Sequence, residues 1–193
     1  MSSRADDTIA AALRAATELV LDAFRRAPAE APVVLIDGRS GAGKTTLAEM
    51  IGERMPPSRP AAIVALDSLY PGWDGLTAGV ETARLRILEP HRRGAPGRWR
   101  RWDWTTAQYA EERIVDPSHP LIVEGSGILT ARTAELADVR VWLEAPEPSR
   151  RQRALRRDGD TYRPHWERWA AQEQHHVDAD RPGELADIRI DVP

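Results

Sequence analysis

Residues 38–45, with the sequence GRSGAGKT, limit the folds open to this chain more strongly than any other segment. They match the pattern G-x-x-x-x-G-K-[ST] at every fixed position, and the apolar run VVLI at 33–36 lies shortly before them. This run is typical of a buried parallel strand, and residues 44–54 favour a helix. Strand, glycine-rich loop and helix in this order predict backbone N–H groups turned inward around phosphate oxygens. We call residues 38–45 the phosphate loop.

The chemistry expected of the phosphate loop gives a role to several side chains. Lys44 should reach the β- and γ-phosphates of ATP, the Thr45 hydroxyl should bind Mg²⁺, and Thr46 should contact the α-phosphate. Lys44 is also the only lysine in the chain. A glycine-rich turn without a ligand is the alternative, but the strand and helix around it favour nucleotide binding. The residues predicted to bind the nucleotide are Gly38, Arg39, Ser40, Gly41, Ala42, Gly43, Lys44, Thr45 and Thr46.

Four more apolar segments have the pattern of strands, at residues 61–66, 121–123, 139–143 and 186–192. Helical patterns alternate with them, at 7–26, 80–89, from Pro146 onward and at 164–177. This alternation predicts an α/β fold, a three-layer α/β/α sandwich around a mainly parallel five-stranded sheet. Residues 90–106, rich in Arg, Gly and Trp, are expected to be irregular. We expect one domain over 1–193, with an N-terminal helix within 1–30 and a lid at about 146–165.

Composition excludes several other classes of protein. The chain contains no cysteine, which rules out disulfides, zinc–thiolate sites, iron–sulfur clusters and a cysteine nucleophile. Its formal net charge is -3, so charge gives no indication of a nucleic-acid or membrane partner. No signal-peptide pattern and no apolar run of about 20 residues is present, and we therefore expect a cytoplasmic protein.

Acidic residues follow two of the predicted strands. Asp67 comes directly after the second strand and Glu124 directly after the third. Ligands of open parallel sheets bind beyond the carboxyl ends of the strands, so both carboxylates should lie near the phosphates. Asp67 could accept the proton of an attacking hydroxyl or hold a magnesium-bound water, and Glu124 could orient Mg²⁺ through water. The two roles can exchange, and the predicted metal set is Thr45, Asp67 and Glu124.

Two arginine-rich segments allow more than one interpretation. Arg150, Arg153 and Arg157 fall on one helical face, which predicts a lid that neutralises phosphate charge or, alternatively, a solvated charged helix. Residues 98–104, RWRRWDW, interleave cations with tryptophans. They could line a substrate pocket, pack in the core, or stack on single-stranded nucleic acid. We expect His175 and His176 to form a polar helix end.

In the order of its motifs the chain resembles the uridine kinase/phosphoribulokinase branch of P-loop kinases. Besides the phosphate loop, Asp67 to Pro71 resembles its Asp-Asp-Phe-Tyr segment, residues 123–125 its Val-Glu-Gly, residues 150–158 its Arg-rich lid, and residues 186–188 its last strand. The resemblance implies that Asp67 is the catalytic base and that Tyr70 lines the substrate site. Arg101, Trp102 and Asp103 resemble the family's Tyr-Asp substrate segment. The Glu-Arg-Gly-Arg run that often follows the lid is absent, so a kinase is implied more strongly than uridine as its acceptor.

The resulting functional hypothesis is an ATP- and Mg²⁺-dependent kinase with a small hydroxyl-bearing acceptor, most simply a nucleoside. The predicted catalytic residues are Lys44, Asp67, Arg150, Arg153 and Arg157. The alternatives are a nucleotide-binding regulator or slow NTPase without an acceptor, and a polynucleotide kinase. A guanine-specific switch is disfavoured because its Asn-Lys-x-Asp element needs asparagine, which this chain lacks. Expected partners are ATP and the small acceptor, without membrane or nucleic acid, and a homo-oligomer is left open.

Overall fold

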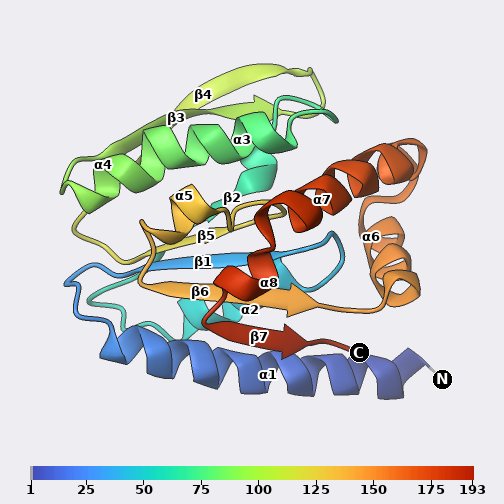
Figure 1. Cartoon of the computed structure of the whole chain (residues 1–193), viewed down its shortest axis with the longest axis horizontal. Helices are drawn as coiled ribbons and strands as arrows, with labels where there is room; N and C mark the ends of the chain where they lie inside the picture. Colours follow the sequence, from blue (N-terminus) through green and yellow to red (C-terminus); the bar gives the residue numbers. More distant parts are fainter. Residues whose placement is uncertain (1) are drawn as a thin grey trace.

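A five-stranded parallel sheet forms the centre of the protein (Figure 1). The computed structural model describes residues 2–193, with side chains described from residue 6 onward. The strands lie in the order β2-β5-β1-β6-β7, and each neighbouring pair is parallel. They are β2 (Ala62–Ala65), β5 (Leu121–Glu124), β1 (Val33–Gly38), β6 (Val139–Glu144) and β7 (Ile188–Asp191). The predicted α/β fold class is confirmed.

Strand β1 explains why the apolar run is continuous rather than alternating. Val33 and Leu35 belong to one hydrophobic cluster, whereas Val34 and Ile36 belong to a second cluster. Successive side chains of a strand point to opposite faces of the sheet, so the two clusters lie on opposite faces. Both faces are covered by helices, which is the usual situation of a parallel sheet.

Different helices cover the two faces. On one side lie α1 (Ser2–Arg26) and α2 (Lys44–Glu53), whose apolar residues pack with Val34 and Ile36. On the other side lie α3 (Leu76–Ala83), α5 (Ala131–Ala134) and α7 (Trp166–Asp180), which contribute to the cluster of Val33 and Leu35. Figure 1 shows α1 along one side of the molecule and α3 along the other. The three layers are therefore helices, sheet and helices.

Short elements connect these layers. The chain passes through η1 (Leu66–Ser68) after β2, η2 (Arg84–Leu88) and α4 (Glu89–Arg92) after α3, and η3 (Arg163–His165) and α8 (Pro182–Leu185) on either side of α7. The predicted lid begins with α6 (Glu147–Tyr162). Helix α1 begins earlier than the sequence pattern predicts, and the predicted helix 80–89 is part of a longer helical stretch from Leu76 to Arg92.

The expectation that residues 90–106 are irregular is wrong. Strands β3 (Gly97–Asp103) and β4 (Gln108–Val115) form an antiparallel hairpin with its own two-stranded sheet. The sequence shows no clear strand pattern here, because charged residues occupy positions that are usually apolar on one face of a strand. Cross-strand ion pairs join Arg98 to Glu112 and Arg101 to Glu111. Such pairs stabilise a sheet much as apolar pairs do, but they leave no hydrophobic alternation to detect.

Among the described residues, no helix is long and apolar enough to cross a membrane.

Candidate nucleotide and acceptor site

The phosphate loop turns tightly between β1 and α2. Gly41 has a φ of 80°, and a Cβ atom at this position would lie 2.2 Å from the carbonyl oxygen of Arg150. Only glycine fits, because α6 passes directly behind the loop. Helix α2 begins at Lys44, immediately after Gly43 with a φ of 104°. The first N–H groups of α2 therefore stand at the loop with no carbonyl in their own helix to bond.

A small pocket of ≈ 140 Å³ lies over the start of α2. Its lining combines the phosphate loop with α6, and consists of Gly41, Gly43, Lys44, Thr45, Thr46, Arg153, Ala154 and Arg157. We call it the cradle. Arg153 donates from Nε to the Gly41 carbonyl at 2.7 Å, while its buried Nη2 has no hydrogen-bond partner in the described part of the chain. Backbone amides, an ammonium group and an unpaired guanidinium nitrogen fit a polyphosphate anion.

Thr45 and Glu124 meet beside the cradle. The Thr45 hydroxyl donates to Glu124 Oε1 at 3.0 Å, and Glu124 is buried. Burial raises the pKa of Glu124 to about 6, with the charge of Asp67 adding to the rise and Lys44 opposing it. No group of three or more acidic or histidine side chains among the described residues is arranged to hold a metal alone. Mg²⁺ commonly takes one or two protein ligands together with substrate phosphates and water, and Thr45 and Glu124 fit that arrangement.

A larger pocket of ≈ 360 Å³ adjoins the cradle. Half of its lining residues are aromatic, and the full set is Ser40, Asp67, Tyr70, Trp73, Trp104, Arg157, Asp158, Thr161, Tyr162 and Trp169. We call it the aromatic pocket. Asp67 remains open to solvent through this pocket, yet the protein atoms around it raise the pKa of its carboxyl, against the charges of Lys44 and Arg157. Arg157 lines both pockets and so lies where they meet.

Comparison with known proteins identifies the fold. No family model matches the chain, and no curated protein matches it. Among solved structures, that of a possible uridine kinase from Bacillus stearothermophilus superposes with a TM-score of 0.69 at 18% identity, covering 92% of this chain and 98% of the other. A candidate fructose transport system kinase from Silicibacter sp. TM1040 gives a TM-score of 0.54 at 18% identity, with the same coverage. The chain has the P-loop NTPase fold. At this identity the likeness concerns the fold.

Within this P-loop fold, the three predicted lid arginines have different surroundings. Arg150 is buried and donates to the carbonyls of Ala145, at 2.9 Å, and Ser40, at 3.2 Å. Arg150 therefore links the backbone at Ala145 to the phosphate loop and does not line the cradle. Arg153 and Arg157 do line it, and Arg157 also donates twice to Asp158, at 2.8 Å each. Arg39 of the phosphate loop points away, toward Gln174 of α7 at 2.5 Å.

The predicted substrate segment lies beside the aromatic pocket rather than in its lining. Arg101 pairs with Glu111, and Trp102 packs edge-on against Tyr109 with ring centroids 5.1 Å apart. The carboxylate of Asp103 accepts the N–H groups of Thr105, at 2.9 Å, and Thr106, so it caps the hairpin turn. That turn carries Trp104 to the pocket, where its Nε1 donates to the Asp67 carbonyl at 2.7 Å. Trp104, and not the expected Trp102, therefore lines the aromatic pocket.

Most of the aromatic wall was not identified from the sequence. Trp73 stacks on Tyr162 with ring centroids 5.3 Å apart, and Trp169 meets Tyr70 edge-on at 4.8 Å. These residues lie far apart in the chain, in the turn after β2, at the end of α6 and in α7. Only the spacing of tryptophans at 166 and 169 gives a signal, since it predicts one inward helical face.

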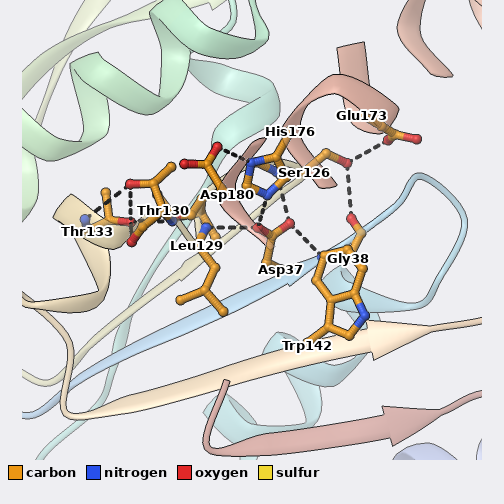
Figure 2. A network of polar contacts seen from close by, with 12 residues as sticks. Asp37, Gly38, Ser126, Leu129, Thr130, Thr133, Trp142, Glu173, His176 and Asp180 are labelled. Carbon is orange, nitrogen blue, oxygen red and sulfur yellow. Dashed lines mark hydrogen bonds and ion pairs between the residues drawn. The ribbon is translucent and has the colours of Figure 1, made fainter. Parts of the chain in front are cut away.

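A buried polar network joins α7 to the base of the phosphate loop (Figure 2). Asp37, at the end of β1, accepts the N–H groups of Gly38, Gly127 and Leu129 at 2.6 to 2.9 Å. His176 of α7 lies with Nε2 2.9 Å from Asp37 and Nδ1 2.9 Å from Asp180. The expectation of a polar helix end at His175 and His176 is wrong, because α7 continues to Asp180; His175 is exposed, whereas His176 is buried.

Proposed function

We propose that this protein is an ATP-dependent phosphotransferase that moves the γ-phosphoryl group to a hydroxyl of a small, ring-bearing metabolite such as a nucleoside. The observation that carries the proposal is the junction of the two pockets. The cradle fits a polyphosphate, the aromatic pocket offers space for a second molecule, Arg157 lines both pockets, and Asp67 lines the aromatic pocket. A hydrolase without an acceptor has no need of the second pocket.

The roles of the side chains follow from their positions. Lys44 and Arg153 would hold the phosphates, and Arg157 would neutralise charge on the group in transfer. Mg²⁺ held by Thr45 and Glu124 would supply further charge neutralisation. Asp67 would accept the proton of the acceptor hydroxyl as the new oxygen–phosphorus bond forms and the bond to the departing ADP oxygen breaks. The protein atoms around Asp67 raise the pKa of its carboxyl, and a raised pKa makes a carboxylate a stronger base.

The walls of the aromatic pocket favour an acceptor with a flat or apolar-faced ring. Tyr162, Trp104 and Trp169 present ring surface, while Ser40, Thr161 and Asp158 supply a few polar groups. Aromatic ring surface combined with a limited number of polar groups is typical of sites for small organic ligands. Arg98 and Arg101 of the hairpin are paired with glutamates, which leaves less free positive charge there for a polynucleotide.

The experiment is a screen of the purified protein with ATP labelled at the γ-phosphate and Mg²⁺ against nucleosides, nucleotides, sugars and vitamin precursors. We expect label transfer to at least one ring-bearing alcohol. Asp67→Asn should retain ATP binding and lower transfer by about 100-fold or more, as for loss of a positioned base. Asp160→Asn, at a fully exposed position, is the matched control. Transfer by Asp67→Asn at the wild-type rate would assign the base to Glu124, and tight ATP binding with no transfer to any acceptor would favour a regulator.

A further inference from the structure

Glu173 of α7 is a buried carboxylate with an unusual set of donors around it. Its side chain is only 2% exposed. One oxygen, Oε1, lies 2.7 Å from both the backbone nitrogen and the hydroxyl of Ser40, 2.8 Å from the Ser126 hydroxyl and 3.0 Å from Trp169 Nε1. Figure 2 shows Glu173 reaching Ser126 from α7. Hydrogen bonds to an ionised acceptor are about twice as strong as neutral ones.

The donors come from three parts of the predicted site. Ser40 belongs to the phosphate loop, Trp169 is a wall of the aromatic pocket, and Ser126 lies in the loop after β5. Ser126 is itself 3.3 Å from the ammonium group of Lys44, and its carbonyl accepts the Tyr70 hydroxyl at 2.7 Å. Directly or through Ser126, the Glu173 carboxylate thus connects the phosphate loop, Lys44, Tyr70 and Trp169.

Glu173 does not line the cradle. The backbone N–H of Ser40 donates to Glu173. This amide therefore faces α7 and does not face the place expected for the phosphates. Glu173 also does not line the aromatic pocket, although Ser40 and Trp169 do. It can therefore act only through the residues that it holds.

We infer that Glu173 is a positioning residue for phosphoryl transfer, which fixes the phosphate loop and the wall of the aromatic pocket at one separation. The inference rests on the proposed function. In-line transfer depends strongly on the distance between donor and acceptor, and small displacements of the groups that hold them are costly. A neutral side chain of the same size would fill the space but would hold four donors less firmly.

The test compares Glu173→Gln with Glu167→Gln, a control on the same helix whose side chain is 83% exposed. We expect Glu173→Gln to lower kcat at least 10-fold, with the best acceptor of the screen or with water if none is found. The KM for ATP should change less than about 3-fold, because Glu173 forms no hydrogen bond with a residue that lines the cradle. Glu167→Gln should match the wild type.

A second readout does not depend on turnover. In ¹⁵N–¹H spectra of the protein without nucleotide, the Ser40 amide proton should move upfield in Glu173→Gln, since it loses a charged acceptor, while the Thr46 amide should stay in place. If Glu173→Gln folds poorly, Ser126→Ala removes the shared hydroxyl and should lower kcat in the same direction by a smaller factor.

The outcomes separate the two proposals. If the wild type neither binds nor turns over ATP with Mg²⁺, the proposed function fails and this inference fails with it. If the wild type is active and folded Glu173→Gln has a kcat within 2-fold of it, only the positioning role is overturned. A Glu173→Gln protein with unchanged kcat and tighter ATP binding would overturn it as well, because Glu173 would then compete with the phosphates.

Discussion

Glu124, which we propose as a ligand of Mg²⁺, lowers the stability of the nucleotide-free protein. Its carboxylate is buried beside Thr45, and burial raises its pKa from 4.5 to about 6. At neutral pH the folded protein therefore holds a charge that water would solvate better, and the raised pKa corresponds to about 2 kcal/mol. The Mg²⁺ site proposed above would need that charge, since the ion would replace the lost water. Under that proposal, stability of the nucleotide-free protein and binding of the metal oppose each other at this residue.

We predict that Glu124→Gln makes the nucleotide-free protein more stable at pH 7.5, by up to about 2 kcal/mol. An acid whose pKa is higher in the folded state binds its proton more tightly there. The wild type therefore gains stability as pH falls from about 6 to 4.5, and the two proteins should converge below 4.5. Urea unfolding at several pH values measures the difference. A variant less stable than the wild type at pH 7.5 would contradict the prediction.

Helix α7 is the element whose importance the sequence concealed most. Its contacts with the phosphate loop and with the end of β1 join residues more than a hundred positions apart, as in the bond from Ser40 to Glu173 and the pair of Asp37 with His176. The phosphate loop could be predicted because its glycines, lysine and threonine act at fixed local spacing. No local sequence pattern indicates a role for Glu173 or His176, because their partners are determined by how α7 packs against the rest of the protein. The hairpin was missed for a related reason, because its charged pairs become visible only when both strands are placed.

His176 supplies the test at this scale. Burial lowers the pKa of His176, but the hydrogen bond and charge of Asp37, helped by Asp180, outweigh it and raise the pKa above 6.5. The stability that this imidazolium contributes is complete below pH 6.5 and is lost as pH rises through the higher folded pKa. We predict that His176→Ala lowers the free energy of unfolding by about 3 kcal/mol at pH 6 and by less at higher pH. In this variant Asp37 would still accept its three backbone N–H groups.

The neighbouring variant His175→Ala is the control, because that side chain is exposed. It should change the free energy of unfolding by less than about 0.5 kcal/mol at every pH. Equal effects of the two substitutions, or a cost of His176→Ala that grows as pH rises, would disprove the role of the buried ion pair.

The whole molecule is held together by two hydrophobic clusters, one on each face of the sheet. Helix α1 belongs to the cluster that also supports the phosphate loop, since the Leu13 side chain lies 3.4 Å from where a Cβ of Gly43 would stand. The other cluster contains Trp166 and Trp169, near the aromatic pocket. Strands β1 and β5 contribute residues to both clusters. We therefore predict that the single domain expected over 1–193 unfolds as one cooperative unit.

Leu13→Ala tests this unity. Leu13 is 3% exposed, and its truncation should cost about 3 kcal/mol, whereas Leu19→Ala on the same helix, at 54% exposure, should cost less than about 0.5 kcal/mol. Tryptophan fluorescence reports mainly on the distant cluster, and far-ultraviolet circular dichroism reports on the helices. Both signals should shift to the same lower denaturant concentration. Separate transitions would show that α1 and its cluster unfold independently.

The solitary lysine has a practical consequence. A protein grown with ¹⁵N-lysine as its only labelled amino acid should give one backbone amide signal, from Lys44 at the start of α2. A titration with any polyphosphate could then be followed at the loop itself, without assignment of the spectrum. The same ε-amine would give amine-directed affinity reagents a single side-chain target.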